Sequence, residues 1–513
     1  MKNLVCAFLI IFSIHVQGAE NNSVTELSLE EAIRQTVKNN LDIQIELINP
    51  DIAQQTLKKN TAIFIPTLDI NFSKTENNSP SRSVLDGGTL TTSENVNASI
   101  SLSQKLALGG TMQISLDNSR YSSTSTFSTM NPSLNSTLTF SLSQPLLKNF
   151  GTHITKRNIL IAANSQRLSQ AAFKQKIIDL IYSVEEAYWN LVYSKRNLEV
   201  KNKSLQLAQD MLRQSEVQVR VGVSAPMDIL TSKAEVAARE SELLQVEGQI
   251  KIAEENLKRI LNITDSPQKI EPSDQPAFTA QQTNFDQFLL TALENRPDIE
   301  QVRLDLKSKR IDVKYYRNQL LPDLQLTASY YTSGLSGDRL IFDGNPFTGG
   351  TVIGVIKGDI WDSLKDTVSN LYRNYSLALK LSIPLKNDLA KSDWVQAQMN
   401  LKKSLLQLKQ VENTIYSEVK QAIIMVEQNQ KIVQASMISR QLAEEKLTAE
   451  QKKLSVGLST HYQVLQFQRD FSTTQTTELK ALIDYNLSLS NLQKILGTTL
   501  EDYGITFTAS SSD

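Results

Sequence analysis

The sequence predicts an internally duplicated membrane protein of mixed α/β class in which α-helix predominates. Three observations support this prediction: the same series of segments occurs twice, two long segments keep a seven-residue apolar repeat, and stretches early in each copy alternate apolar with polar residues. The composition agrees, because only 6% of the 513 residues are aromatic and Gly and Pro number 18 and 13. We therefore expect long antiparallel coiled-coil helices together with antiparallel membrane-spanning strands.

The amino-terminal residues are typical of a signal peptide. A basic start, Met1-Lys2-Asn3, precedes an apolar run from Leu4 to Val16, and the small residues Gly18-Ala19 suit cleavage before Glu20. This run is too short to span a bilayer comfortably, although a retained membrane anchor is the alternative. We expect residues 1–19 to be a signal peptide and the protein to be exported.

Composition and charge argue against several classes of protein. Lys and Arg number 53 against 54 Asp and Glu, so the net charge of -1 provides no attraction to nucleic acid. Because Cys6 and His15 lie in the predicted signal peptide, the exported chain would contain no cysteine and only His153 and His461. Neither histidine has a metal-ligand spacing, and no Walker-type phosphate loop occurs. We therefore expect no metal, no cofactor and no enzyme activity.

Two copies of one sequence pattern follow each other along the chain. The segment from Leu29 to Ile43 aligns with Phe285 to Ile299 at a shift of 256 residues, and Val221-Gly222-Val223-Ser224 matches Val456-Gly457-Leu458-Ser459 at a shift of 235. Copies of this length exceed the periods of about 20–50 residues that solenoid repeats have. Each copy is therefore expected to be a large unit with the same order of elements.

Each copy is predicted to begin with a pair of helices, to continue in strands and to end in a long helical hairpin. The Asn49-Pro50-Asp51 segment predicts a kink or break in the first copy alone, because Pro lacks an amide donor. The predicted segments are the signal peptide at 1–19, the first-copy leading helices at 20–65, strands and loops at 66–147 and long hairpin at 148–262, a linker at 263–283, the second-copy leading helices at 284–321, strands and loop at 322–386 and long hairpin at 387–497, and a carboxy-terminal tail at 498–513.

The long helices keep a seven-residue repeat, which predicts coiled-coil packing in which each apolar seam needs a partner helix. After Gly222 and Gly457 the apolar pattern resumes, so we expect two antiparallel helical hairpins with the Val-Gly-[Val/Leu]-Ser segments at their tips. Arg440 interrupts the second seam and is expected at a surface or register-setting position. The repeat comprises Ile177, Val184, Leu191, Leu198, Leu205, Leu212 and Val219 in the first copy and Val419, Val426, Val433, Arg440, Leu447 and Leu454 in the second.

Alternating residues predict strands in both copies. Residues 137–143, 324–330 and 376–385 alternate apolar side chains with small or polar ones. Strands of this kind suit a wall between lipid and water, although a soluble half-buried sheet would have the same pattern. The export signal favours the membrane wall.

The number of wall strands is open between four and six per chain. An additional alternating pair, 96–106 and 112–116, occurs only in the first copy and either joins the wall or forms a separate hairpin. Long polar loops are expected at about 119–135 and 332–374, where Ser, Thr, Asn and Gly accumulate.

This duplicated order of helices, Pro-marked strands, long helices and Gly-centred tips resembles the TolC-like outer membrane efflux protein family. The resemblance implies a homotrimer in which each chain gives strands to one antiparallel transmembrane β-barrel in the outer membrane lipid and helices to one coiled-coil helical barrel in the periplasm. It also implies a periplasmic adaptor (membrane fusion) protein and an inner-membrane transporter as partners, with efflux or type I secretion as the function. The segments that carry it are Val221-Gly222-Val223-Ser224 with Asp228, Val456-Gly457-Leu458-Ser459 with Gln463, and Ser143-Gln144-Pro145-Leu146.

The resemblance implies two sets of site residues. An entrance constriction is implied at Asp228, Gln463 and Gln466. Because the tips of this family meet the adaptor, the contact candidates are Val221, Gly222, Val223, Ser224, Val456, Gly457, Leu458 and Ser459.

The implied constriction departs from the family pattern. Gln463 and Gln466 stand where the family often has acidic residues, and the usual Tyr and Arg partners of the first-copy carboxylate match Leu454 and Ser459. Asp228 is the acid that remains. It is either one of three carboxylates in a ring that favours cations or a solvated acid or cap at a helix start. The alternative to a channel is an exported coiled-coil protein with a structural or adhesive role, whose strands do not insert in a membrane.

Overall fold

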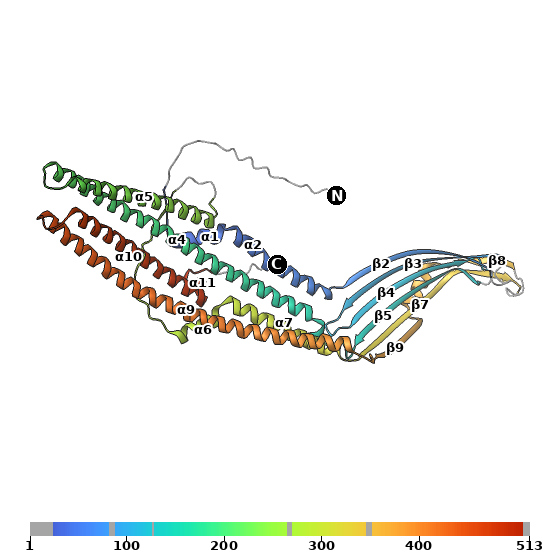
Figure 1. Ribbon diagram of the computed structural model, residues 1–513. Helices are drawn as coiled ribbons and strands as arrows, with labels where there is room; N and C mark the ends of the chain where they lie inside the picture. Colours follow the sequence, from blue (N-terminus) through green and yellow to red (C-terminus); the bar gives the residue numbers. More distant parts are fainter. Residues whose placement is uncertain (1–23, 82–87, 126–127, 264–268, 345–350, 506–513) are drawn as a thin grey trace, which may run out of the picture. The chain divides into compact units, whose positions relative to one another are not determined.

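The computed structural model describes residues 24–81, 88–125, 128–263, 269–344 and 351–505 (Figure 1). The predicted signal peptide at 1–19 lies outside these residues. The chain is mainly helical with antiparallel strands, as the sequence predicted. It divides into a helical unit, Met1–Leu47 with Phe173–Pro297 and Val411–Asp513, and a sheet unit, Ile48–Ala172 with Asp298–Gln410.

Four long helices dominate the chain (Figure 1). They are α4 (Arg157–Arg220), α5 (Pro226–Leu261), α9 (Asp388–Ser455) and α10 (His461–Leu496). Since α4 has 64 residues and α9 has 68, each is roughly 100 Å long at about 1.5 Å per residue. The first pair and the second pair each form a hairpin. None of the described helices is both long and apolar enough to cross a lipid bilayer.

The apolar seam of α4 is buried only along part of its length. Ile177, Val184 and Leu191 are fully buried in the core of the helical unit, whereas Leu198 and the seam residues after it are half-buried. The predicted seam is therefore buried at the beginning of the segment, while the residues buried nearer the tip are mostly small or polar. The buried residues of that part are Ser194, Asn197, Ser204, Ala208, Met211 and Ser215.

Arg440, which interrupts the second seam, is partly exposed. Its guanidinium lies 2.8 Å from Glu444 on the same helix and 2.6 Å from Glu478 on α10. The pairing across the hairpin agrees with a register-setting position.

Each copy begins with two consecutive helices. These are α1 (Leu29–Asn39) and α2 (Leu41–Thr61), which ends in the 3-10 turn η1 (Ala62–Phe64), and α6 (Phe285–Asn295) and α7 (Pro297–Gln319). The side chains of Ser28 and Asn284 cap α1 and α6 at matching positions, each accepting a hydrogen bond from a backbone amide of the first turn. The leading helices are thus duplicated down to their caps.

Of the kink or break predicted at Asn49-Pro50-Asp51, the break is wrong, because α2 runs through Pro50 as one helix. Pro50 removes one amide donor, so the carbonyl of Glu46 loses its partner within the helix. Most of the surrounding side chains are exposed, and water can hydrate that carbonyl without a break in the backbone.

Two short strands that were not predicted join the start of the first copy to the linker. β1 (Val24–Leu27) pairs in parallel with β6 (Lys269–Pro272). Beside them, Asp274 Oδ2 accepts hydrogen bonds from the amide of Leu29 at 2.7 Å and from the hydroxyl of buried Tyr188 at 2.6 Å. These contacts close the core of the helical unit around the amino-terminal segment.

The sheet unit contains one antiparallel sheet of seven strands (Figure 1). The order is β2-β3-β4-β5-β7, and the far side of β7 pairs with β9 along its first half and with β8 near its end. The sheet therefore has six long strands and a short one, with β2 at one edge and β9 at the other. The strands are β2 (Thr67–Pro80), β3 (Leu90–Lys105), β4 (Thr111–Ser123), β5 (Met130–Pro145), β7 (Asp323–Asp343), β8 (Thr351–Ile356) and β9 (Tyr372–Ser382).

The polar loops predicted at about 119–135 and 332–374 are largely strand and helix. β4 continues to Ser123 and β5 begins at Met130, while the second region contains the end of β7, the strand β8 and the helix α8 (Ile360–Val368). Side chains are polar on both faces of several of these extensions, so no alternation marks them. The backbone ladder continues because its hydrogen bonds do not depend on side-chain type.

The sheet has one apolar face and one polar face, because its long strands pair in register and side chains alternate between faces. The two faces are best seen in adjacent cross-strand rows. One row consists of Leu68, Leu102, Ile114, Phe140, Tyr330 and Tyr375, and the next row, on the opposite face, consists of Asp69, Ser101, Ser115, Thr139, Tyr331 and Asn374.

Candidate functional site

The two helical hairpins turn in the same way. In the first tip, residues 221–225, the amide of Val223 donates to the carbonyl of Gln218 and the amide of Gly222 donates to that of Val219. In the second tip, residues 456–460, the pattern is the same: the amide of Leu458 donates to the carbonyl of Lys453, and the amide of Gly457 donates to that of Leu454. This is the Schellman arrangement, and both glycines have φ +78°. Each glycine is therefore required by the backbone.

Apolar side chains at the tips are exposed to solvent. Val221 and Val223 in the first tip and Val456 and Leu458 in the second all have most of their surface accessible. Exposed apolar side chains of this size, gathered at a chain reversal, are a feature of interaction surfaces. These four are the tip residues best placed to touch another molecule.

The tip serines, Ser224 and Ser459, point back to the protein, unlike the exposed apolar residues. Ser224 Oγ donates to Gln218 Oε1 at 3.0 Å, and Ser459 Oγ donates to Glu450 Oε1 at 2.5 Å. The hydrogen bond from Ser459, assisted by the charge of Lys453, lowers the pKa of Glu450. Both serines are half-buried and fasten the turn to the helix that precedes it.

Asp228 lies in the first turn of α5, where the helix dipole favours a carboxylate. It is not the cap, since Ala225 occupies that position and Pro226 follows it. Within the described parts of the chain its side chain makes no hydrogen bond or ion pair. Gln463 and Gln466 are exposed on α10, and Gln463 accepts a hydrogen bond from Ser459 at 3.2 Å.

His461 is the titratable group that Asp228 influences. It is the first residue of α10 and only 4% exposed, and its Nε2 has no hydrogen-bond partner among the described groups. Burial lowers the pKa of His461, and the negative charge of Asp228 offsets this only in part. Burial therefore favours the uncharged form of the His461 imidazole, and the Asp228 carboxylate works against this.

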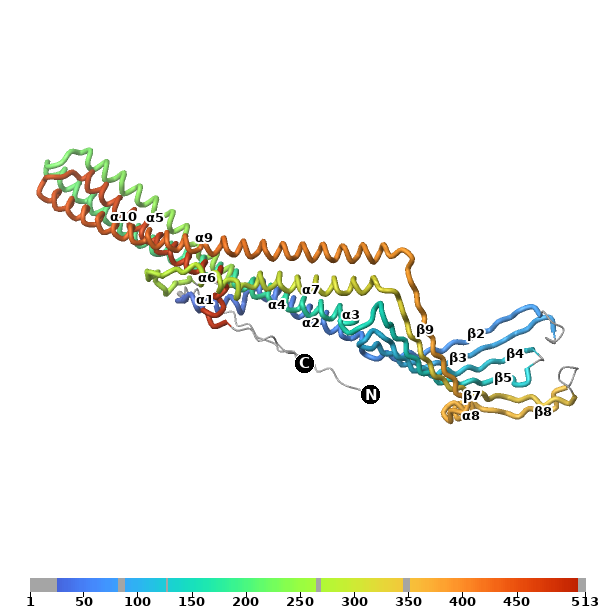
Figure 2. The backbone as a smooth tube through the Cα atoms, turned by 90° about the horizontal axis from the view of Figure 1, so that it is seen from below, coloured from blue at the N-terminus to red at the C-terminus, as the bar shows by residue number. Residues whose placement is uncertain are grey.

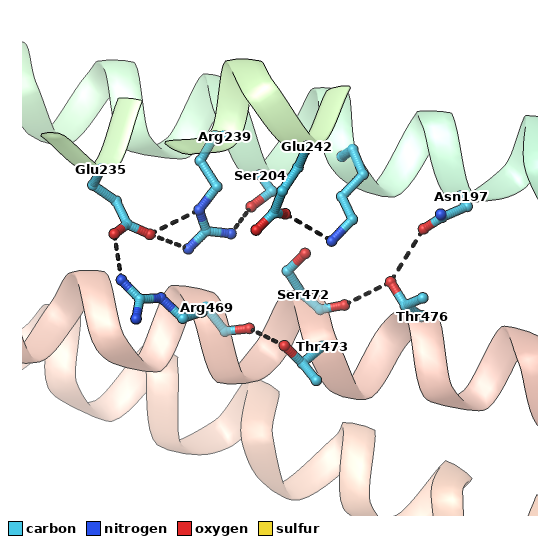
Figure 3. Close-up of polar contacts among 10 residues, drawn as sticks. Asn197, Ser204, Glu235, Arg239, Glu242, Arg469, Ser472, Thr473 and Thr476 are labelled. Carbon is cyan, nitrogen blue, oxygen red and sulfur yellow. Dashed lines mark hydrogen bonds and ion pairs between the residues drawn. The ribbon is translucent and has the colours of Figure 1, made fainter. Parts of the chain in front are cut away.

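A buried charge network connects three helices of the helical unit farther from the tips (Figure 3). Glu235 on α5 pairs with Arg239 on the same helix at 2.6 Å and with Arg469 on α10 at 2.5 Å, and Arg239 also donates to Ser204 on α4. The side chains of Glu235 and Arg239 are 8% and 3% exposed, whereas that of Arg469 is 60% exposed.

The two arginines determine the ionisation of the Glu235 carboxyl. Burial raises its pKa, but the hydrogen bonds and charges of Arg469 and Arg239 outweigh burial and lower the pKa overall. Glu235 is therefore held as a carboxylate, paired with the buried guanidinium of Arg239 and the exposed guanidinium of Arg469.

Further polar contacts join the same helices (Figure 3). Lys201 pairs with Glu242 at 2.8 Å between α4 and α5, and Thr476 on α10 donates to Asn197 on α4 at 3.2 Å. This region was missed from the sequence, because Glu235 and Arg239 have the i, i+4 spacing of an ordinary exposed helix pair. The one available signal was the run of small and polar residues between the seam leucines of α4.

The chain matches a known protein family over most of its length. The model described as "Outer membrane efflux protein" matches residues 112–262 and 289–498, which is more than half of the chain. The chain belongs to the outer membrane efflux protein family. Its two matched segments begin within the sheet or the leading helices of each copy and run through both tips, so the family pattern covers both hairpins.

Individual relatives of this outer membrane efflux protein are distant in sequence. Nodulation protein T of Rhizobium leguminosarum bv. trifolii is 21% identical over 351 residues, which are 66% of this chain and 67% of the relative. A solved membrane protein from Pseudomonas aeruginosa matches with a TM-score of 0.64 at 16% identity, covering 91% of this chain and 93% of the other. The Campylobacter jejuni CmeC outer membrane channel matches with a TM-score of 0.64 at 13% identity, covering 99% of both.

The family and the fold are those of channel proteins. The protein is located in the outer membrane, with its helical part in the periplasm. The resemblance of the duplicated motifs to this family is thus confirmed.

Proposed function

We propose that three copies of the chain form one exit duct through the outer membrane. In this arrangement the sheets join edge to edge into a single barrel, and the helices of the three chains form one tunnel in the periplasm. The tips then meet a periplasmic adaptor that couples the duct to an inner-membrane transporter, for efflux or for type I secretion.

The observation that carries the proposal is the sheet with two faces and two free edges. β2 and β9 each have one side without a strand partner in the described chain, and side chains of both are exposed along their whole length. A free strand edge is not tolerated in lipid, where every backbone amide and carbonyl needs a partner. The apolar face can lie against lipid, and further copies of the chain can pair with the free edges of β2 and β9.

The strand count supports a water-filled bore. Six long strands per chain would give 3 × 6 = 18 strands in a closed trimer. Barrels of about 16–18 strands leave an aqueous channel, unlike barrels of about eight strands, which side chains fill. The polar face, with Ser, Thr, Asn and Asp in register, would then line that channel.

The duct would carry solute without chemistry of its own. A polar lining lets a solute cross the lipid without losing its hydration, and directional work is supplied by the inner-membrane partner. Opening would require the tip helices to move apart, and an adaptor that binds the open arrangement more tightly would favour it. The exposed valines and leucine of the tips supply apolar contacts for such a partner.

Isolation from outer membranes tests the proposal. We expect an SDS-resistant, heat-modifiable trimer that conducts ions in planar bilayers. A soluble, elongated dimer recovered from the aqueous phase would contradict the duct and support the exported coiled-coil scaffold instead. Co-purification with an adaptor separates the coupling from the channel itself, because a conducting trimer that binds no adaptor would leave only the coupling in error.

A further inference from the structure

A short amphipathic helix, α8, follows β8 and precedes β9 in the sequence and packs on the sheet. α8 begins after Asp359, whose side chain and that of Asp362 form a capping box, and it has nine residues. Ser363 and Thr367, one turn apart, are fully buried, while Trp361 and Val368 are 71% and 78% exposed. The helix therefore has a small polar side against the protein, and two apolar side chains, Trp361 and Val368, that are largely exposed.

The buried side of α8 is seated on β5 and β7 (Figure 2). Ser363 Oγ donates to the carbonyl of Gly334 at 2.9 Å, and Thr367 Oγ1 donates to that of Ser136 at 2.9 Å. A Cβ atom on Gly334 would lie 1.9 Å from the carbonyl oxygen of Ser363. Glycine at this position is what permits the helix to approach so closely.

The strand register shows which face of the sheet α8 covers. Gly334 is directly opposite Ser136, and Thr332 is directly opposite Leu138. Side chains two residues apart share a face, so Gly334 and Thr332 lie on the same face as Tyr330 and Leu326. α8 therefore lies on the apolar face, which faces lipid if the sheet closes into a barrel.

The helix lies at the border of the apolar surface. On β7 the apolar face runs from Leu324 to Tyr330, and α8 covers the small residues that follow, from Thr332 to Ser336. The Tyr330 hydroxyl, at the end of the apolar segment, is 2.5 Å from Asn370 Oδ1 just after α8. Tyr375, opposite Tyr330, is also exposed. Aromatic residues are typical of the level where lipid meets water.

The sequence of α8 suits that level. Trp361, Leu364 and Val368 have the i, i+3, i+7 spacing of one helix side, and Asp362 and Asp366 lie on another. The exposed Lys365 is at the edge of the apolar side, where a long stem can lie along apolar surface while its charge reaches water. The helix is much too short to cross a bilayer, but a Trp with an apolar strip beside charged residues is typical of helices that lie in the interface.

We propose that α8 is an interfacial helix that rests in lipid at the outer-leaflet boundary of the apolar belt, with Trp361, Leu364 and Val368 in contact with acyl chains. The inference rests on the proposed barrel, because the apolar face meets lipid only when the sheet is closed. It commits to lipid as the occupant because the apolar side of α8 is continuous with the membrane-facing side of β7.

A spin label tests the occupant directly. Cys6 is the only cysteine in the sequence, so the Cys6→Ser chain is a cysteine-free background in which Trp361→Cys and Asp366→Cys place one label on either side of α8. Each variant is first examined for the SDS-resistant trimer and then reconstituted in phosphatidylcholine vesicles. Accessibility is measured to oxygen, which concentrates in lipid, and to a water-soluble nickel complex.

We expect the label at position 361 to collide with oxygen more than with the nickel complex, and the label at position 366 to show the reverse. A label at 361 that is open to the nickel complex would overturn the proposal, as would one shielded from both reagents by a neighbouring chain. If Trp361→Cys fails to assemble, Val368→Cys on the same side replaces it. If the cysteine-free chain itself forms no trimer, the proposed duct is contradicted. A water-exposed label on a normal trimer contradicts only the role of α8.

Discussion

The carboxylate of Glu235 on α5 accepts a hydrogen bond from the guanidinium of Arg469 on α10 at 2.5 Å. This contact joins a helix of the first copy to a helix of the second. Glu235 is nearly buried and Arg469 is mostly exposed, so the two partners contribute unequally to the stability of the helical unit.

Loss of Glu235 should therefore be more harmful than loss of Arg469. In Glu235→Gln the buried Arg239 keeps its charge without a carboxylate, and removing one partner of a buried pair costs about 3–5 kcal/mol. In Arg469→Gln the Glu235–Arg239 pair remains, and an exposed arginine contributes about 1 kcal/mol or less. Thermal unfolding followed by circular dichroism of the detergent-solubilised protein compares them. Equal losses would mean that the network does not depend on burial.

His461 should make the second tip sensitive to pH. The pKa of His461 in the folded tip is below the ordinary value of 6.5, so the locally unfolded tip binds a proton more tightly than the folded tip. The contribution of uncharged His461 to the stability of the folded tip is complete above pH 6.5. It is lost as the pH falls below this value towards the folded pKa. Hydrogen exchange of the first amides of α10, corrected for intrinsic rates, should show reduced protection on the acidic side.

Two substitutions control the pH experiment. His461→Gln should abolish the pH dependence, whereas His153→Gln, at an exposed position in the sheet unit, should preserve it. Unchanged dependence in His461→Gln would assign the effect to another group.

The tip glycines should be intolerant of alanine for backbone reasons alone. Nothing lies within 4 Å of a Cβ placed on Gly222 or Gly457, but both have φ +78°. Gly222→Ala and Gly457→Ala should each cost about 1–2 kcal/mol, measured as protection of the last turns of α4 and α9. Gly248, inside α5 and equally open, is the matched control, and Gly248→Ala should stabilise its helix by about 1 kcal/mol. A neutral result at both tips would contradict the strain argument.

The two faces of β9 should respond differently to a charge. Leu379 is on the apolar face and its neighbour Ala378 is on the polar face. Leu379→Arg should cost about 2–4 kcal/mol per chain if that face meets the lipid midplane, whereas Ala378→Arg should be tolerated in a watery lumen. The yield of heat-modifiable trimer in the outer membrane measures both. The opposite order would mean that the faces are assigned the wrong way round.

Asp228 should affect ion selectivity if three copies bring it to the axis. Asp228→Asn should lower the preference of the reconstituted channel for cations, because a ring of carboxylates stabilises them at a constriction. Glu240→Gln removes the same charge from an exposed position farther along α5 and should have no effect. Reversal potentials in a salt gradient measure the preference. Equal values in the unmodified protein and both variants would mean that Asp228 interacts only with the dipole of its own helix.

Much of the helical part could be predicted from local patterns. The Gly222 and Gly457 turns, the matching caps at Ser28 and Asn284, and the buried seam at Ile177 and Val184 follow from rules that act within a few residues. The site residues themselves stay predictions, because the partner that would contact them is another molecule.

The remainder depends on distant parts of the chain. The pairing of Glu235 with Arg469 joins positions 234 residues apart, and nothing near either residue indicates it. The strand extensions have no apolar alternation, so their pairing depends on the whole sheet. The sequence predicts a polar loop where α8 lies, because its buried residues, Ser363 and Thr367, are polar. They are buried only because Gly334 lets the helix approach.

The parallel pair β1–β6 sets an order of events during export. Val24 pairs with Lys269, so β1, the first strand of the described chain, has no hydrogen-bonding partner until more than half of the chain has reached the periplasm. During that time its unpaired edge is open to other chains, and chaperones that bind extended segments would shield it. The core around Tyr188 also contains Ile483 of α10, so it can close only after the second copy has followed the linker.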